Sequence, residues 1–432
     1  MTATAPPRPP VPRRVLLLVG VAIVLTGLNL RTAVNSVGPV LQEIEDGLGV
    51  SSAAAGVITT LPVLCFAALG FAGPPLAARF RDGHVLAAAL LMMALGLLGR
   101  AAAGSFALFL LGTAAAMTGG ALGNVMLPSL VKRWFPTRTG LLVSAYGTAM
   151  AIGGALASGS TAAIAGRIGE GGWRWALAVW AVLALVAVVP WLAVPAQPVA
   201  ATGRPASVRM RSLLHSRLTW AMIVVFGLQS TQAYIIIGWT AQYLRDQGMS
   251  ASSAGLLVGL NAVISIPVNA LVPPLAVRQR LQRPLLVSFV CFLVAGWSGL
   301  AVAPLTATWV WVVLLGLGLG TFAMVLTLMG LRARTPESTA ALSTVTQGGG
   351  YVLAAAGPLL VGVLRGSTGG YTGMFVVVFA GAVLLLLAGW GVCRERYVDD
   401  EVAGLAAGAA DGSSGPTVEV AGAEPPVVVT ER

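Results

Sequence analysis

Twelve apolar stretches follow one another along the chain, and this succession limits the possible folds more than any other feature. Most are 20 to 28 residues long, which is enough for a helix to cross the roughly 30 Å hydrocarbon core of a bilayer. Only 9% of the residues are charged, against about 25% in a soluble domain. Barrel strands would be about 10 residues long and alternate in polarity. We therefore predict an all-α membrane protein, because in lipid only helices and closed barrels satisfy the backbone.

The predicted spans form two sets of six. They cover residues 15–42, 52–78, 84–103, 106–133, 139–167, 173–195, 217–244, 252–277, 284–304, 308–331, 338–365 and 371–393. The predicted domains are a cytoplasmic tail (1–14), an N-terminal half (15–195), a central cytoplasmic loop (196–216), a C-terminal half (217–395) and a disordered cytoplasmic tail (396–432). The last segment is assigned from its content of Gly, Ala, Pro and acidic residues.

The basic residues predict the orientation. If the N-terminus is cytoplasmic, most of the 26 Lys and Arg residues fall in cytoplasmic segments, as the positive-inside rule requires. We predict a multi-pass protein of the inner cell membrane with both termini in the cytoplasm. The net charge of +11 is then explained without a nucleic-acid partner, since no basic patch carries interleaved aromatic residues. Lipid is the expected surrounding, and a monomer is the expected state.

The residues that could carry chemistry are few. The three cysteines lie far apart in or beside apolar runs, and no Cys/His cluster is present. We expect no metal site and no cofactor. No phosphate-binding loop motif occurs, and no Ser/His/Asp or paired-carboxylate arrangement is found. These observations argue against an enzyme.

The two halves repeat each other. "VSSAAAGVITTL" (50–61) matches "MSASSAGLLVGL" (249–260), and "PPLAARFR" (74–81) matches "PPLAVRQR" (273–280), both at an offset of 199. Shared low complexity is the alternative explanation, but the Pro-Pro-Leu-Ala pair with its basic loop argues against it. A parallel six-plus-six repeat predicts a transporter in which the site lies near the midplane between the halves and the halves rock for alternating access.

Arg31 is the most unusual residue of the first span. It lies about 24 Å along the helix from Val15, where an arginine is costly. In a continuous helix it shares one face with Gly27, Asn35, Gly38 and Gln42. We interpret this stripe as the wall of a polar cavity, with Arg31 holding an anionic or electron-rich substrate. The alternatives are that Arg31 extends to the lipid headgroups or bonds a backbone carbonyl.

The positions of the acidic residues support this interpretation. None of the fifteen Asp and Glu residues lies in the middle of a predicted span, so Arg31 has no buried carboxylate to neutralise it. The repeat also aligns "GLN" (27–29) with "GLQ" (227–229), at an offset of 200. Thr231 then stands where the first half has Arg31, so the second half has no cation there. The source of energy stays open: a coupling proton could use Glu43 at the cavity mouth, or the substrate could carry the proton itself.

Other polar and aromatic residues within the spans are further candidates. Such groups either line a cavity or bond neighbouring helices, and both possibilities remain. The predicted substrate-binding set is Arg31, Asn29, Asn35, Asn124, Gln229, Tyr234, Trp239, Gln347 and Tyr351.

Several stretches together resemble one family. "NLRTAVNSVGPVLQEI", "GLQSTQAYIIIGWTAQYL" and "LSTVTQGGGYVLAAAGPLLVGVL" are similar to the cyanate / 2-nitroimidazole transporter (CynX/NimT-like) family of the major facilitator superfamily. The resemblance implies a twelve-helix porter for a small anion or nitrogen heterocycle. Two alternatives remain: an exporter of drugs or metabolites with the same fold, and a membrane sensor that does not transport.

Overall fold

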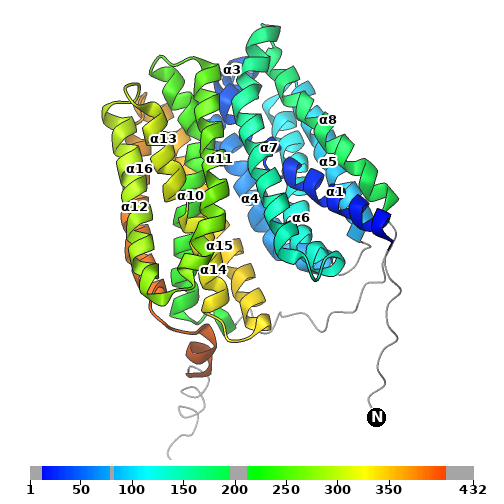
Figure 1. Cartoon of the computed structure of the whole chain (residues 1–432). Coiled ribbons are helices and arrows are strands. Elements are labelled where there is room, and N and C mark those ends of the chain that lie inside the picture. Colours follow the sequence, from blue (N-terminus) through cyan, green and yellow to red (C-terminus); the bar gives the residue numbers. More distant parts are fainter. Residues whose placement is uncertain (1–11, 78–81, 195–211, 405–432) are drawn as a thin grey trace, which may run out of the picture.

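The computed structural model describes residues 12–77, 82–194 and 212–404 (Figure 1). In these ranges all regular elements are helical, and twelve helical segments are long and apolar enough to cross a membrane. The predicted all-α fold with twelve spans is confirmed.

The helices follow the predicted spans closely. They are α1 (Arg13–Asn29), α2 (Thr32–Asn35), the 3-10 turn η1 (Gly38–Val40), α3 (Leu41–Leu48), α4 (Ser52–Ala77), α5 (Asp82–Ala102), α6 (Phe106–Trp134), α7 (Thr139–Ile168), α8 (Gly172–Ala193), α10 (Arg217–Asp246), α11 (Ala251–Ala276), α12 (Gln279–Val302), α13 (Thr308–Gly318), α14 (Thr321–Leu331), α15 (Pro336–Thr368) and α16 (Thr372–Val392). Two of the twelve spans are interrupted. The first is divided into α1, α2, η1 and α3, and the tenth into α13 and α14.

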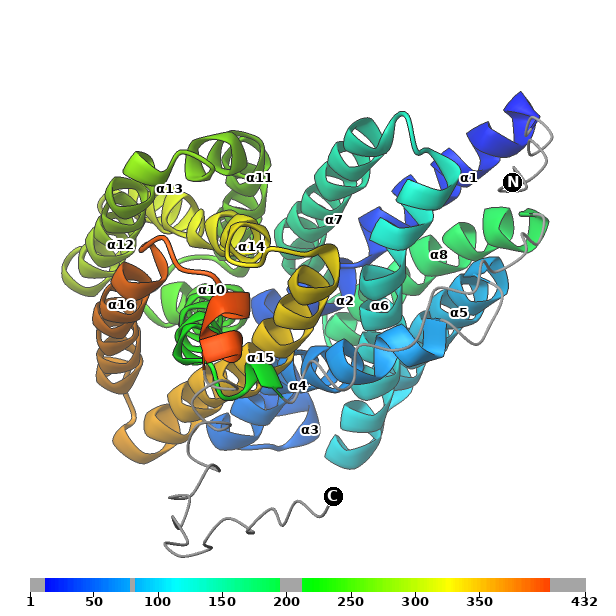
Figure 2. The same cartoon turned by 90° about the horizontal axis from the view of Figure 1, so that it is seen from below.

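The helices form two groups. Figure 2 shows α1 to α8 together and α10 to α16 together, and the groups meet mainly where α4 packs on α15 and α7 on α11. Glycines allow this approach. A Cβ added at Gly362 of α15 would lie 2.7 Å from the Cα of Gly56 of α4, and one at Gly255 of α11 would strike the carbonyl oxygen of Ser158 of α7. These contacts involve the N-terminal parts of α4 and α11 and the C-terminal parts of α7 and α15, and Figure 1 shows α3 at that end of the bundle.

Ion pairs between the groups reinforce this end, called here the α3 end. Arg245 of α10 forms two 2.8 Å bonds with the carboxylate of Glu43 of α3. Arg365 of α15 lies 3.4 Å from Glu45 and 2.9 Å from Asp246. Two of these pairs join α3 to α10 and to α15 across the boundary between the groups, and the third joins α15 to α10 within the second group. This end of the bundle is therefore closed.

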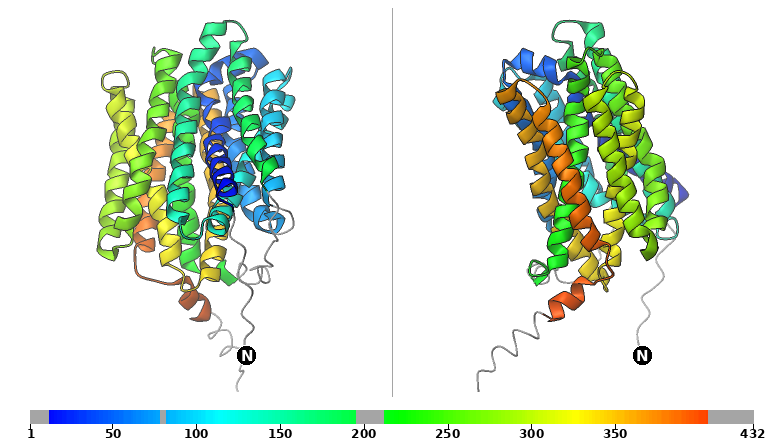
Figure 3. Two further views of the ribbon diagram at one scale, coloured as in Figure 1. Left: turned by 45° about the vertical axis from the view of Figure 1, so that its right-hand side comes forward. Right: turned by 90° about the vertical axis from the view of Figure 1, so that its left-hand side faces the viewer.

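The ordered chain continues beyond the predicted start of the C-terminal tail. The prediction of disorder from residue 396 is wrong for 396–404, because residues 398–404 are helical. Asp399 accepts hydrogen bonds from the Arg334 amide and the Ser338 hydroxyl, and Glu401 accepts from Ser216 at 2.7 Å. Figure 3 shows this segment below the bundle, at the end opposite α3. It is held to the ends of α10 and α15.

Several predictions concern residues that lie outside the described ranges. Most of the N-terminal tail (1–11), most of the central loop (195–211), the tail from 405 and the repeated basic residues Arg79 and Arg81 lie outside the described residues. The boundaries assigned to the two halves and to their connections stay predictions, as does the cytoplasmic position of the termini.

Candidate functional site

A polar cavity lies between the two groups of helices. Two adjoining spaces of about 120 Å³ and about 390 Å³ share Arg31, Met150, Tyr234, Phe322 and Tyr351 as walls. The first space is bounded mainly by α7, α10 and α11, and the second by α6, α7, α14 and α15. Together they form a chamber of the size that proteins use for organic ligands, about 300–1,000 Å³.

Arg31 reaches this chamber from a break in the first span. Leu30 and Arg31 form a turn between α1 and α2, and Arg31 is the residue that precedes α2. The break lies where α7 passes: a Cβ added at Gly153 would strike the carbonyl oxygen of Leu28, and one at Gly154 would lie 3.3 Å from the Cβ of Arg31. Small residues on α7 thus let the interrupted span approach closely and direct Arg31 into the cavity.

The break in the first span shows that the prediction of one continuous polar stripe is wrong. Because the helix is not continuous, only Arg31 and Asn35 of the stripe line the chamber. Gly27 packs against the backbone of Tyr146, Gly38 against the carbonyl oxygen of Ile237, and Gln42 is exposed at the α3 end.

The charge of Arg31 is not cancelled by a neighbouring acid. Within the described part of the chain no carboxylate lies within ion-pair distance of its guanidinium. Its electrostatic neighbours are the phenols of Tyr234 and Tyr351. Asn35 is 3% exposed and its side-chain oxygen has no hydrogen-bond partner. That oxygen is itself buried, so the guanidinium of Arg31 is the charged group that this wall presents to the chamber.

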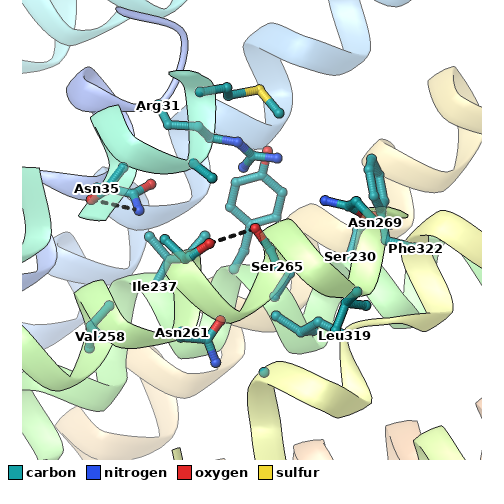
Figure 4. Close-up of a pocket in the computed structure, with 18 of the residues that line it drawn as sticks. Arg31, Asn35, Ser230, Ile237, Val258, Asn261, Ser265, Asn269, Leu319 and Phe322 are labelled. Carbon is teal, nitrogen blue, oxygen red and sulfur yellow. Dashed lines mark hydrogen bonds between the residues drawn. The ribbon is translucent and has the colours of Figure 1, made fainter. Parts of the chain in front are cut away.

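The facing wall is neutral and polar. Gln229 and Ser230 of α10 line it, together with Asn261, Ser265 and Asn269 of α11. Figure 4 shows Arg31 and Asn35 across from Asn261 and Ser265. The three α11 residues were missed in the sequence, although their i, i+4, i+8 spacing places them on one helical face and was the available signal.

Aromatic side chains complete the chamber. Tyr351 packs edge-on against Phe226, with ring centroids 5.0 Å apart, and its ring centroid is 6.4 Å from that of Tyr234. Phe66 lies 5.8 Å from the same ring. These flat walls next to Arg31 suit a planar ligand, since aromatic faces stack on rings and conjugated groups.

Seven of the nine predicted residues line the chamber. They are Arg31, Asn35, Asn124, Gln229, Tyr234, Gln347 and Tyr351. The structure excludes the other two from the walls of both spaces. The amide of Asn29 donates to the carbonyl oxygens of Leu25 and Leu183 at 2.9 and 3.2 Å. The indole of Trp239 is fully buried and donates to the Pro358 carbonyl at 3.2 Å. Both side chains join helices instead.

The chamber offers hydrogen bonds and charge but no metal-binding set. Among the described residues no three His, Cys, Asp or Glu side chains come close enough together to hold a metal ion. The groups in its walls are the guanidinium, amides, hydroxyls and aromatic rings.

Sequence comparison decides the family. Residues 17–358 match the Major Facilitator Superfamily. The chain belongs to the Major Facilitator Superfamily. It is thus a multi-pass membrane transporter, and members of this superfamily are generally not enzymes.

Relatives in this superfamily agree with the resemblance seen in the sequence. The 2-nitroimidazole transporter of Escherichia coli is 34% identical over 386 residues, which cover 89% of this chain and 96% of the relative. The cyanate transport protein CynX of the same organism is 30% identical, with 81% and 90% covered. An uncharacterized transporter of Bacillus subtilis, YycB, is 36% identical, with 87% and 93% covered. The chain therefore belongs to the cyanate / 2-nitroimidazole transporter family.

Solved structures share the fold. An inward-facing bacterial homolog of the human lysosomal transporter Spinster superposes with a TM-score of 0.73 at 17% identity, covering 89% of this chain and 97% of that one. A D-xylose–proton symporter gives 0.69 at 15% identity, with 88% and 98% covered. These major facilitator structures match the arrangement of the helices across most of the chain.

Proposed function

We propose that this transporter moves a small anion or nitrogen-containing heterocycle across the inner membrane by alternating access, with Arg31 as the substrate anchor. The observation that carries the proposal is the cation of Arg31 in a chamber where no acid among the described residues neutralises it. Arg31 is partly buried, and a charge inside a membrane span is costly without a partner. A substrate that brings an anionic or electron-rich group supplies the missing partner.

The neighbours of Arg31 support a planar nitrogen compound. The guanidinium of Arg31 presents N–H donors in one plane, so a ligand with acceptor nitrogen or oxygen atoms in one plane suits this wall. Tyr234 and Tyr351 provide flat surfaces next to it. The relatives named for 2-nitroimidazole and for cyanate make these two compounds the first to test.

The remaining assignments follow from the same proposal. Asn124 and Gln347, in the larger space, contact the substrate on its path toward the end opposite α3, and Gln229 contacts it from the second half. We assign the end opposite α3 to the cytoplasm, with both termini on that side. The transporter acts as a monomer, and a proton accompanies the substrate either on the substrate or through a carboxylate at the α3 end.

Binding to the purified protein tests the substrate class. A thermal-shift screen should show stabilisation by 2-nitroimidazole or cyanate that grows with ligand concentration, because a ligand of the folded state stabilises it by RT ln(1 + [L]/Kd). Nitrate, carboxylates and imidazole define the breadth of the class. Stabilisation by lipophilic cations alone would refute the proposal and favour an exporter.

Transport into proteoliposomes tests the anchor. Arg31→Ala should abolish uptake while expression persists, since a hydrogen bond to a charged group contributes about 1.5–3 kcal/mol. This loss corresponds to about 10–150-fold in affinity. Arg31→Lys should restore uptake only in part, because a lysine lacks the planar fork of donors. Normal uptake by Arg31→Ala would refute the assignment.

A further inference from the structure

A buried arginine on α5 holds the backbone that carries Arg31. Arg100 of α5 is 0% exposed and lies outside both spaces of the chamber. Its guanidinium donates at 2.9 Å to the carbonyl oxygen of Ala33 and at 2.9 Å to the hydroxyl of Ser36. Both acceptors belong to the single turn α2 and the residue after it, directly beyond Arg31.

The break in the first span explains why a cation is needed there. In a continuous helix the Ala33 carbonyl would accept from the amide four residues later, which is Val37. The Val37 amide instead donates to Val34. An unsatisfied carbonyl away from water costs several kcal/mol. Arg100 satisfies this carbonyl, and Ser36 donates to the same oxygen while accepting from Arg100.

Arg100 is not held there by an acid. No ion pair joins it to a carboxylate of the described residues, and its Nε atom has no hydrogen-bond partner. Its polar contacts are therefore those to the broken span. A buried guanidinium committed to two atoms of one helical turn fixes the position of that turn.

The internal repeat provides a comparison within the same molecule. At the repeat offset of 199 to 200, the second half has Ser230 or Thr231 in place of Arg31 and Gly299 or Leu300 in place of Arg100. The corresponding span α10 is continuous over 30 residues. The half that has both arginines has the broken helix, and the half that lacks both has an intact one.

We propose that Arg100 is a positioning residue for substrate binding: it fixes the turn α2 so that Arg31 points into the chamber. This inference rests on the proposed function of Arg31. Arg100 does not touch the substrate and acts through Ala33 and Ser36. Its loss should weaken substrate binding as well as lower stability, whereas a residue with only a structural role would lower stability alone.

Arg174 supplies a matched control. This arginine of α8 also donates to backbone carbonyls, those of Ala101 and Ala103, at 3.0 and 2.5 Å, but it does not contact the broken span. Arg100→Gln should weaken binding of 2-nitroimidazole or cyanate at least about tenfold, since loss of the Arg31 contact alone corresponds to about 10–150-fold in affinity. Arg174→Gln should change binding by less than about twofold, although both variants lower the melting temperature.

Two further variants separate position from charge. Arg100→Lys keeps the charge but cannot replace the planar fork, so it should restore only part of the affinity. In an Arg31→Ala background, Arg100→Gln should cause no additional loss, because residues that act through one contact are not additive. The inference would be overturned if Arg100→Lys restored the full affinity, or if the losses of affinity in Arg31→Ala and Arg100→Gln were additive. Equal losses of affinity in Arg100→Gln and Arg174→Gln would also overturn it.

The inference can be tested even if a variant misfolds or the substrate is wrong. If Arg100→Gln does not fold, Ser36→Ala removes only one of the two acceptors and should weaken binding about two- to fivefold; unchanged binding would then refute the role. If the wild-type protein binds neither compound, the proposed substrate class fails, but hydrogen exchange still reports on Arg100. Amides of residues 30–37 should exchange faster in Arg100→Gln than in Arg174→Gln, and equal rates would refute the inference.

Discussion

The bidentate ion pair between Glu43 and Arg245 should control how readily the α3 end opens. Both bonds are 2.8 Å long, and Arg245 also donates to the carbonyl oxygen of Pro39 at 3.0 Å. The pair joins the two halves, so it must break when that end opens during alternating access. Glu43→Gln removes the charge while keeping the shape of the side chain, and it should shift the population toward the open state.

The exposure of the two side chains determines how much free energy is lost when the pair is broken. The Arg245 side chain is 14% exposed and that of Glu43 is 33% exposed. Fully exposed pairs contribute about 0.2–1 kcal/mol, whereas breaking a buried pair costs about 3–5 kcal/mol. An intermediate site should lose about 1–2 kcal/mol, and 1.4 kcal/mol is a factor of ten in an equilibrium. The open population should therefore rise about 5- to 30-fold.

Distance measurements between spin labels test this shift. Labels at Gln42 and Gln247, both exposed at the α3 end and in different halves, report its width once the three native cysteines are replaced. Arg334→Gln is the matched control, because Arg334 forms a similar 2.8 Å pair with Asp400 inside one half. A distance distribution that is unchanged in Glu43→Gln, or that shifts as much in Arg334→Gln, would refute the reasoning.

Three further perturbations have expected outcomes. Gly362→Val places a side chain where a Cβ already lies 2.7 Å from the Cα of a glycine on α4, so the same labels should report a wider α3 end. Gln232→Ala removes the side-chain oxygen that accepts the 2.8 Å hydrogen bond of the Trp297 indole. It should lower the free energy of unfolding by about 1–2 kcal/mol, seen as a melting temperature below that of the comparison variant Gln229→Ala. A hydrogen bond from the neighbouring arginine lowers the pKa of Asp400, so its contribution to the docking of residues 398–404 is complete above about pH 3.9. It is lost as the pH falls through the lower folded-state pKa. The anisotropy of a dye at the exposed Ala403 should be constant from pH 5 to 8 and fall only in stronger acid; a fall near neutral pH would contradict this assignment.

Hydrophobicity and the internal repeat are sufficient to predict the scaffold. Each span is long enough to exclude other folds, and the offset of 199 pairs helices that occupy equivalent places in the two groups. The same reasoning identified Arg31, because a charge inside an apolar span requires an explanation. These features depend on composition and spacing, which are visible in one sequence.

The break in the first span was not predicted, because packing decides it. The stretch from Asn29 to Pro39 is compatible with a continuous helix, and only the approach of Gly153 to the Leu28 carbonyl shows where α1 must end. Asn29 and Trp239 were misassigned for a related reason. A polar group within a span either faces a cavity or bonds a neighbouring helix, and the rotation of the helix determines which of these occurs.

The ordered segment after α16 was not predicted, because its acidic residues were judged only by the composition of the tail. Asp399, Asp400 and Glu401 resemble a solvated tail in the sequence. In the structure they meet donors that are distant along the chain, the Arg334 side chain and amide and the hydroxyls of Ser216 and Ser338. Partners separated by 61 to 185 residues leave no local pattern from which such contacts can be predicted.

The departures from the repeat coincide with the functional features. Two equivalent halves would place two arginines on opposite walls of one chamber, and like charges repel across a low dielectric. Here one half provides Arg31 with its broken helix and its support from Arg100, and the other provides neutral amides and hydroxyls from Gln229 to Asn269. A site built in this way matches a ligand with one negative or electron-rich end and a hydrogen-bonding remainder. The repeat thus accounts for the scaffold, and our proposal assigns the selection of the substrate to the residues that break the repeat, Arg31 directly and Arg100 through the turn α2.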